Sequence, residues 1–544
     1  MPLPVLHTPK LPPPYDELVD FPEADPESML GIFHDNLYSK ENIEKALTQT
    51  LFKGSKELHD EKVKGLSESE LGEFMQMYVR AKVPRADRKY HVIIYGVSGY
   101  TGRLILEYIK RHVKDEGFTF ACAGRTPAKV EAVLAEVFAG HPLLGKIDVI
   151  RASLDNVFDI ERMVHECRVV VNVAGPFMLT GGEALVEACI EYDTDYVDVN
   201  GEIPYAARLL EWHEPALKAA VHVVPCAAYA GGMPDLGAFW TVKRLRETFG
   251  EETRRCRGYL STEGNVAALA PSGGTLATRA AMATSTKKDR AAMANNFSLG
   301  GRVHGGHRDE DQDAFLNQIL YDDTRQCWLA PHQYAFFETR VVRRANMLSM
   351  QLRDVWCARR PAARRRDHRA PSSPGFSESE HRGGESRAFR YGRDFNFTCF
   401  LDVPDEKVAR DIKKTAASSR AEVKELEQQG KLYKAGEGPP IEELLDERDV
   451  PKVSTTYAFI AEGAVTGRKF ETSFTGGDGY YETAHMAVEV ALSLALHRPR
   501  ISKSVRGGVL TPAISCGEVL FERLTASGFK YAEGVFEAKE VAAE

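Results

Sequence analysis

The stretch His91-Val-Ile-Ile-Tyr95-Gly96-Val-Ser-Gly99-Tyr-Thr-Gly102 joins an apolar, strand-like run to a glycine-rich turn and the start of a helical pattern. In such a turn the first glycine permits the sharp bend, the second lets the backbone approach a pyrophosphate, and the third lets helix and strand pack closely. Backbone N–H groups and the helix dipole then face the phosphates. The spacing is GxxGxxG rather than GxGxxG. It predicts a dinucleotide site that includes Gly96, Ser98, Gly99, Tyr100, Thr101 and Gly102.

Strand-like and helix-like segments alternate from Tyr90 to Cys226, and the last helix-like segment runs from Tyr205 to Ala220. Alternation of this kind builds βαβ units around a buried parallel sheet. The alternation is lost between Gly231 and Thr475, where two strand-like runs flank a glycine-containing turn at Glu462-Gly463-Ala464. We therefore expect an α/β fold: a Rossmann-type doubly wound parallel sheet with an inserted α+β domain and a helical C-terminal return.

This fold divides the chain into four expected parts. They are an N-terminal helical extension (1–88), an NADP-binding Rossmann domain (89–230), an inserted α+β domain for substrate or dimer contacts (231–475), and C-terminal helices that pack on the Rossmann domain (476–544).

The composition is that of a globular protein, with 43% hydrophobic and 27% charged residues among 544. A net charge of −8 argues against a general nucleic-acid binder. No signal-peptide pattern and no apolar run of about 18 residues is present. The nine cysteines form no C-x-x-C pair and no metal-ligand spacing stands out, so we expect reduced, buried thiols and no metal site. These features predict an intracellular, cytoplasmic protein.

An Arg-, Ser- and Gly-rich segment, residues 353–390, interrupts the inserted domain. It has almost no core-forming residues, so we expect a disordered surface insertion. A nucleic-acid or anionic-lipid contact and an error in the gene model are the alternatives.

The residue after the second strand-like run selects the cofactor. An NAD-specific unit carries Asp or Glu there to hold the ribose 2′-hydroxyl, whereas this sequence has Arg125, followed by Lys129 one helical turn later. A guanidinium binds a phosphate bidentately, and no carboxylate is present to repel it. The sequence therefore favours NADP over NAD.

Polar and small residues follow the later strand-like runs. The fourth run ends in Asn172, and the sequence continues to Gly175, Pro176 and Phe177, with Phe177 expected as a wall of the crevice where nicotinamide and substrate meet. Candidates for acid–base work follow the fifth and sixth runs; they are Asp198, Glu202 and Tyr229. Capping of the next helix is the alternative role for the two carboxylates.

These segments resemble the saccharopine dehydrogenase-like oxidoreductases, a family that includes trans-acting enoyl reductases. Further landmarks of the family follow in order; they are Ser272-Gly-Gly-Thr275, Arg340-Val-Val-Arg-Arg344, Tyr391-Gly392 and Gly507-Gly-Val-Leu-Thr-Pro512. The resemblance covers residues 90–525. One departure is Ala228-Tyr-Ala-Gly-Gly-Met-Pro-Asp235, because members commonly show Gly-Phe-Asp-Ser shortly before this Pro and Asp. If those residues serve substrate binding or proton transfer, this chain differs in substrate or in activity.

The resemblance implies an NADP-dependent oxidoreductase that reduces a C=C or C=N bond of a hydrophobic or lipid-linked small molecule. It also implies roles in lipid metabolism, and association with lipid droplets, peripheral membranes or mitochondria, with a homodimer as a plausible assembly. A non-catalytic NADP-binding scaffold or redox sensor is the main alternative. An adaptor that acts through residues 353–390 is the third interpretation.

Overall fold

The computed structural model describes residues 83–115, 117–264, 271–301, 309–358, 391–416, 428, 432–501 and 505–537. The chain separates into two units, Met1–Val83 and Pro84–Glu544. The expected N-terminal extension therefore lies outside the described residues, apart from its last few positions. There, Arg85–Asp87 form a 3-10 turn, η1.

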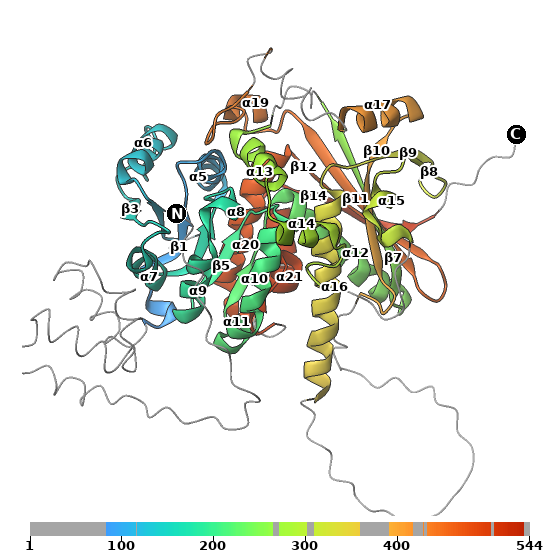
Figure 1. The fold of residues 1–544 in the computed structure, drawn as a ribbon, viewed down its shortest axis with the longest axis horizontal. Coiled ribbons are helices and arrows are strands. Elements are labelled where there is room, and N and C mark those ends of the chain that lie inside the picture. Colours follow the sequence, from blue (N-terminus) through green and yellow to red (C-terminus); the bar gives the residue numbers. More distant parts are fainter. Residues whose placement is uncertain are drawn as a thin grey trace, which may run out of the picture. The chain divides into compact units, whose positions relative to one another are not determined.

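The predicted alternation of strands and helices builds a seven-stranded sheet whose neighbouring strands are all parallel (Figure 1). Its strand order is β13-β6-β5-β4-β1-β2-β3. The chain adds β2 and β3 on one side of β1 and the later strands on the other side, as in a doubly wound sheet. In β1, Val92 and Ile94 belong to the core on one face, while Ile93 belongs to the core on the other. The strands are β1 (Tyr90–Tyr95), β2 (Phe120–Gly124), β3 (Asp148–Arg151), β4 (Cys167–Asn172), β5 (Asp195–Asp198), β6 (His222–Val224) and β13 (Gly508–Val509).

Helices cover both faces of this sheet, because consecutive apolar side chains along a buried strand point to opposite faces and both faces are therefore apolar. One face is covered by α5 (Tyr100–His112), α6 (Pro127–Val137) and α20 (Gly479–Ile501). The other is covered by α7 (Val157–His165), α9 (Glu183–Glu191) and α11 (His213–Ala219). The short helices α8 (Phe177–Thr180) and α10 (Ile203–Leu209) follow β4 and β5. The predicted doubly wound parallel sheet is confirmed.

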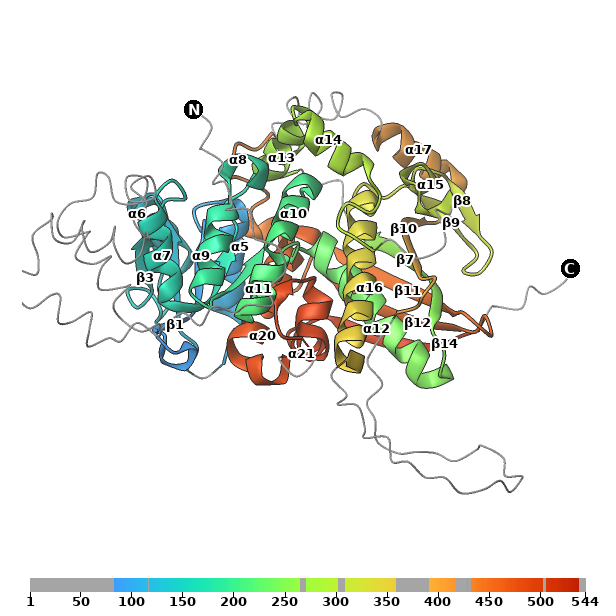
Figure 2. The same ribbon diagram turned by 60° about the horizontal axis from the view of Figure 1, so that its bottom comes forward.

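The inserted region forms a second, mixed sheet with the order β14-β12-β11-β7-β10-β9-β8, in which only β7 and β10 are parallel neighbours. Figure 2 shows α12 and α16 beside this sheet, and both helices contact its strands. The strands are β7 (Thr253–Glu263), β8 (Leu320–Asp322), β9 (Cys327–Ala330), β10 (Asn396–Val403), β11 (Ser454–Gly463), β12 (Lys469–Gly476) and β14 (Lys530–Phe536). The helices of the region are α12 (Tyr229–Phe249), α13 (Gly273–Ala283), α14 (Lys287–Ala294), α15 (Asp313–Leu316), α16 (Ala335–Ala358), α17 (Glu406–Ala416) and α19 (Ile441–Leu444).

The structure corrects three expectations about secondary structure. Residues 476–544 contain α20 and α21 (Pro512–Ala526), but also β13 and β14, which extend one sheet each, so helices alone do not describe this part. The segment expected to be disordered from residue 353 is still helical up to Ala358, and residues 359–390 lie outside the described residues. The stretch from Tyr205 to Ala220, expected as one helix, is divided into α10 and α11 by a 3-10 turn.

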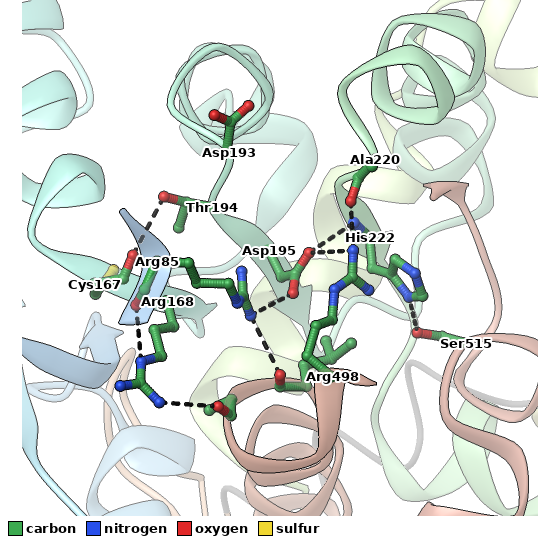
Figure 3. Close-up of polar contacts among 12 residues, drawn as sticks. Arg85, Cys167, Arg168, Asp193, Thr194, Asp195, Ala220, His222, Arg498 and Ser515 are labelled. Atoms are coloured by element: carbon green, nitrogen blue, oxygen red, sulfur yellow. Dashed lines mark hydrogen bonds and ion pairs between the residues drawn. The ribbon is translucent and has the colours of Figure 1, made fainter. Parts of the chain in front are cut away.

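Charged side chains gather at the amino edge of the parallel sheet, where the strands begin (Figure 3). The Asp195 carboxylate, fully buried at the start of β5, lies 2.6 Å from Arg85 Nη2 and 3.6 Å from Arg498 Nη2. It also accepts a hydrogen bond of 2.8 Å from the backbone N–H of His222. Burial alone would raise the pKa of Asp195, but the two guanidinium groups outweigh it and hold that pKa below its usual value. These contacts join η1, β5, β6 and the end of α20.

Candidate active site

The three glycines of the turn after β1 differ in whether the packing of the protein itself excludes a larger residue. Gly96 has φ +99°, and a Cβ there would lie 2.8 Å from the backbone nitrogen of Ala174. A Cβ on Gly102 would lie 2.4 Å from Val97 Cα. At Gly99, by contrast, the nearest atom to a Cβ would be 3.4 Å away, and φ is not left-handed. The protein's own packing therefore explains Gly96 and Gly102 but not Gly99.

The surface beside Gly99 is open. Ser98 is exposed, Thr101 is half-buried, and the first turn of α5 has no side-chain cap. Backbone N–H groups at an uncapped helix start attract anions. Tyr100 differs from its neighbours because its ring is buried and its hydroxyl donates a 2.8 Å hydrogen bond to the carbonyl of Pro439.

Arg125 and Lys129 lie at the carboxyl end of β2, where the adenosine end of a dinucleotide is expected. Both side chains are exposed, Arg125 directly after the strand and Lys129 on α6. No carboxylate of the described residues forms an ion pair with Arg125. Its guanidinium is therefore available to an anion.

The turn after β4 has a buried and an exposed part. Asn172 is buried, accepts a hydrogen bond from the Ala174 N–H (3.1 Å) and donates one to the Tyr196 hydroxyl (3.1 Å). Gly175 is exposed and Pro176 is half-buried. Phe177, expected as a wall of the crevice, is buried, and its ring lies against Tyr205 with ring centroids 5.3 Å apart.

The carboxylate of Asp198 is held by neutral donors at the end of β5. It accepts hydrogen bonds from the Asn200 N–H (3.0 Å), the Asn200 side chain (2.5 Å), the Cys226 N–H (3.0 Å) and the Tyr196 hydroxyl (3.0 Å). Burial raises the pKa of Asp198 to about 6, although these donors partly oppose the shift. Asp198 thereby joins the ends of β5 and β6.

Glu202 is the N-cap residue of α10, but its side chain makes no cap hydrogen bond there. Instead it accepts hydrogen bonds from the N–H groups of Phe177 (2.9 Å) and Met178 (2.7 Å), at the start of α8. It also accepts one from the Thr278 hydroxyl on α13 (3.2 Å). Burial raises the pKa of Glu202 above its usual value. The capping role therefore holds for α8 rather than for the next helix, and it links the parallel-sheet domain to the inserted region.

Tyr229 begins α12, just beyond the carboxyl end of β6. Its hydroxyl is buried and has no hydrogen-bond partner among the described residues. Burial raises the pKa of this phenol well above its usual value, and the carboxylates of Glu482 and Glu338 add to the effect. The phenol therefore keeps its proton at neutral pH.

The sequence did not indicate a buried polar network near Tyr229. Glu338 on α16 accepts hydrogen bonds from the Tyr457 hydroxyl (2.6 Å) and the Cys399 thiol (3.1 Å), and it lies 3.0 Å from His332 Nε2. A histidine beside a buried carboxylate is a common acid–base pair. These residues are far apart in the sequence, so no local motif reveals them.

Comparison with known proteins agrees with this geometry. Residues 92–223 match the family model described as the saccharopine dehydrogenase NADP binding domain. Over these residues the chain is similar to that domain. The predicted resemblance and the prediction of NADP as the cofactor are thereby confirmed.

Several curated proteins are similar to the chain. A Bos taurus saccharopine dehydrogenase-like oxidoreductase is 29% identical over 170 residues, which are 30% of this chain and 39% of that protein. A Caenorhabditis elegans lipid droplet localized protein is 30% identical over 160 residues, 29% of this chain and 37% of that protein. A Mycobacterium tuberculosis protein named as a trans-acting enoyl reductase is 26% identical over 470 residues, 81% of this chain and 96% of that protein. The chain thus matches less than half the length of the first two relatives.

Among solved structures, apo saccharopine dehydrogenase (L-Glu forming) from Saccharomyces cerevisiae covers 82% of this chain and 99% of its own, with 10% identity and a TM-score of 0.40. Within the described residues, no helix is long and apolar enough to cross a membrane.

Proposed function

We propose that the chain is an NADP-dependent oxidoreductase that reduces a C=C or C=N bond of a hydrophobic or lipid-linked small molecule. The observation that carries the proposal is a pair of glycines at the edge of the sheet where the strands end, the half-buried Gly99 and the exposed Gly175, neither of which internal packing requires. A ligand that needs close backbone approach explains them. The family match of residues 92–223 supports NADP as that ligand.

The residues divide into three groups along this edge. We assign the 2′-phosphate to Arg125 and Lys129, and the pyrophosphate to Ser98, Thr101 and the turn glycines. Gly175 and Pro176 face the nicotinamide end, and Asn172 fixes the fold of their turn. Bound NADPH supplies the hydride. Asp198 and Glu202 position the edge, because each accepts several hydrogen bonds from the protein itself.

Tyr229 is our candidate for the proton donor. Of the three predicted acid–base residues, it is the one whose side chain has no hydrogen-bond partner among the described residues. The Tyr229→Phe variant, which keeps the ring, should lose turnover while it binds NADPH as the wild type does. Full turnover of this variant on an identified substrate would remove Tyr229 from the mechanism.

The substrate class rests on the relatives rather than on the site. One relative is named as a trans-acting enoyl reductase and another as a lipid droplet localized protein. A hydrophobic substrate and work at a lipid surface, with a homodimer as the assembly, are therefore parts of the proposal. Steady NADPH oxidation with members of a panel of enoyl and imino compounds would support it.

A non-catalytic NADP-binding scaffold is the second candidate. It is favoured by one observation, the engagement of both predicted carboxylates in hydrogen bonds that hold the fold. Tight NADPH binding without turnover of any compound in the same panel would favour the scaffold over the reductase.

A further inference from the structure

A segment of the inserted region lies directly on the glycine turn. Residues 434–440, which we call the strap, precede α19. The Tyr100 hydroxyl, at the start of α5, donates a 2.8 Å hydrogen bond to the strap carbonyl of Pro439. A Cβ on Gly438 would lie 2.7 Å from the Tyr100 ring, and one on Gly436 would lie 3.8 Å from the Ser98 carbonyl oxygen. The strap therefore passes the turn with its backbone, at two positions that lack side chains.

The strap has a fixed shape of its own. The Glu437 N–H donates to the carbonyl of Lys434 (2.9 Å), and the Glu437 carboxylate accepts from the Lys434 N–H (3.0 Å). The backbone carbonyl of Glu437 accepts a 2.9 Å hydrogen bond from the N–H of Gly273 at the start of α13. A Cβ on Gly273 would lie 1.8 Å from the Lys434 carbonyl oxygen, so only glycine fits beneath the strap.

A second contact holds the same two helix starts together. The ring of Tyr480 meets Tyr100 edge-on, with ring centroids 5.3 Å apart. Its hydroxyl accepts a 2.7 Å hydrogen bond from the N–H of Ser272. The start of α13 is thus joined to the start of α5 both by the strap and by these two tyrosines.

The strap bounds the turn without filling it. Ser98 stays exposed although the strap backbone passes close to its carbonyl. Lys434 is exposed on the strap, and the carboxylate of Glu437 is turned back to the Lys434 N–H. Two glycines therefore lie beside the exposed Ser98: Gly99 follows it in the chain, and Gly436 of the strap approaches its carbonyl. Backbone of this kind is what a pyrophosphate recognises.

From these contacts we propose that the strap is the outer wall of the pyrophosphate subsite and that the cofactor leaves only when the strap separates from Tyr100. This inference rests on the proposed NADP site. It assigns to the inserted region a direct part in cofactor binding, in addition to any part in substrate binding. Because the pyrophosphate is common to both dinucleotides, the strap acts equally on NADPH and NADH.

The test is a stopped-flow measurement of NADPH and NADH binding and release by the full chain. Tyr100→Phe keeps the ring and removes the hydrogen bond to the strap, a loss of about 0.5–1.5 kcal/mol for a neutral pair. We expect release of both dinucleotides to accelerate by about two- to tenfold, and their Kd values to rise by the same factor. Gly438→Ala, whose Cβ meets the Tyr100 ring, should have at least as large an effect. Gly534→Ala is the matched control, since nothing lies within 4 Å of a Cβ at that position.

The possible outcomes distinguish a failure of the proposed role of the strap from a failure of the proposed NADP site. Release rates and Kd values within twofold of wild type in both strap variants would overturn the role of the strap alone. A change for NADPH without a change for NADH would also overturn it, because that pattern belongs to the 2′-phosphate end. If the wild type binds neither dinucleotide, the proposed function fails together with the inference.

Discussion

Asp195 and Asp198 begin and end the same short strand, β5, and both side chains are fully buried, but their surroundings differ in charge. Asp195 lies beside the guanidinium groups of Arg85 and Arg498, which hold its pKa below its usual value against the effect of burial. Asp198 accepts hydrogen bonds from neutral groups, and burial raises its pKa to about 6. Only two residues of the strand, Tyr196 and Val197, lie between the ion cluster and a carboxyl group whose pKa is raised.

The two aspartates show that the two edges of the parallel sheet are held together by different interactions. At the amino edge, charges from η1, β5 and α20 compensate one another and hold three distant chain segments. At the carboxyl edge, where the strands end, several hydrogen bonds from neutral groups to Asp198 and Glu202 hold the turns of the proposed cofactor site. The two edges are therefore held by different interactions, ion pairs at one edge and hydrogen bonds from neutral groups at the other.

The largest expected effect is the loss of the Asp195 charge. Asp195→Asn leaves two guanidinium groups facing a neutral amide, and breaking a buried ion pair costs about 3–5 kcal/mol. Asp198→Asn keeps an acceptor oxygen and should cost about 1 kcal/mol. Urea unfolding at pH 7 measures both losses. Equal losses in the two variants would contradict the contrast between the edges.

The pH dependence of the same two variants should have opposite slopes. The pKa of Asp198 rises on folding from 3.8 to about 6, so its contribution to the free energy of unfolding falls as pH rises through this range. At 1.36 kcal/mol per unit, the fall amounts to about 3 kcal/mol. The contribution of Asp195 is present at neutral pH and is lost as pH falls, since its pKa is lowered on folding.

The measurement is the stability difference between wild type and each variant by urea unfolding from pH 4 to 7. That difference should decrease with rising pH for Asp198→Asn and should not decrease for Asp195→Asn. Asp155→Asn, at an exposed position, serves as the control. Parallel slopes for the two β5 variants would count against the assigned charge states.

At the cofactor end of the carboxyl edge, Arg125→Ala should weaken NADPH binding by about ten- to hundredfold. A charged hydrogen bond to the 2′-phosphate contributes about 1.5–3 kcal/mol. NADH, which lacks this phosphate, should bind the variant as it binds the wild type. Fluorescence titration with both dinucleotides compares them. An equal loss for NADH would place Arg125 elsewhere in the site.

The smallest expected effect concerns the hydrogen bond between Glu202 and Thr278. Thr278→Val removes a 3.2 Å hydrogen bond that joins α13 to the carboxyl edge. It should lower the free energy of unfolding by about 0.5–1.5 kcal/mol. Thr284→Val is a matched control, because that hydroxyl bonds only to carbonyls of α13 itself. Equal effects of the two variants would show that the contact with Glu202 contributes nothing.

The sequence predicted the parallel sheet because each strand from β1 to β6 carries a local apolar run. It did not predict β13, which has two residues, or β14, an exposed edge strand with charged positions. It also missed α12, which contains Gly231, Gly232 and Pro234. Those glycines are helix breakers in isolation, but here they permit close contacts: a Cβ on Gly231 would lie 2.3 Å from the Cys226 carbonyl, and one on Gly232 would lie 2.8 Å from Met486.

The candidate site was predictable where its residues directly follow a strand. Gly99, Arg125 and Gly175 belong to this group, since the carboxyl ends of parallel strands share one edge. The contact between Tyr100 and the strap joins residues 339 positions apart, and no local pattern reveals such a pair. The burial of Phe177 against Tyr205 was not predictable, because an aromatic residue after a strand suits a crevice wall and a buried core equally well.

The late strands β13 and β14 have a consequence for how the protein is made. β13 pairs with β6 in the parallel sheet, and β14 pairs with β12 in the mixed sheet. Both sheets therefore await residues near the end of the chain, whatever order their earlier strands adopt. During translation, neither sheet completes its edge until β13 and β14 have left the ribosome, so the strands made earlier wait beside an unpaired edge.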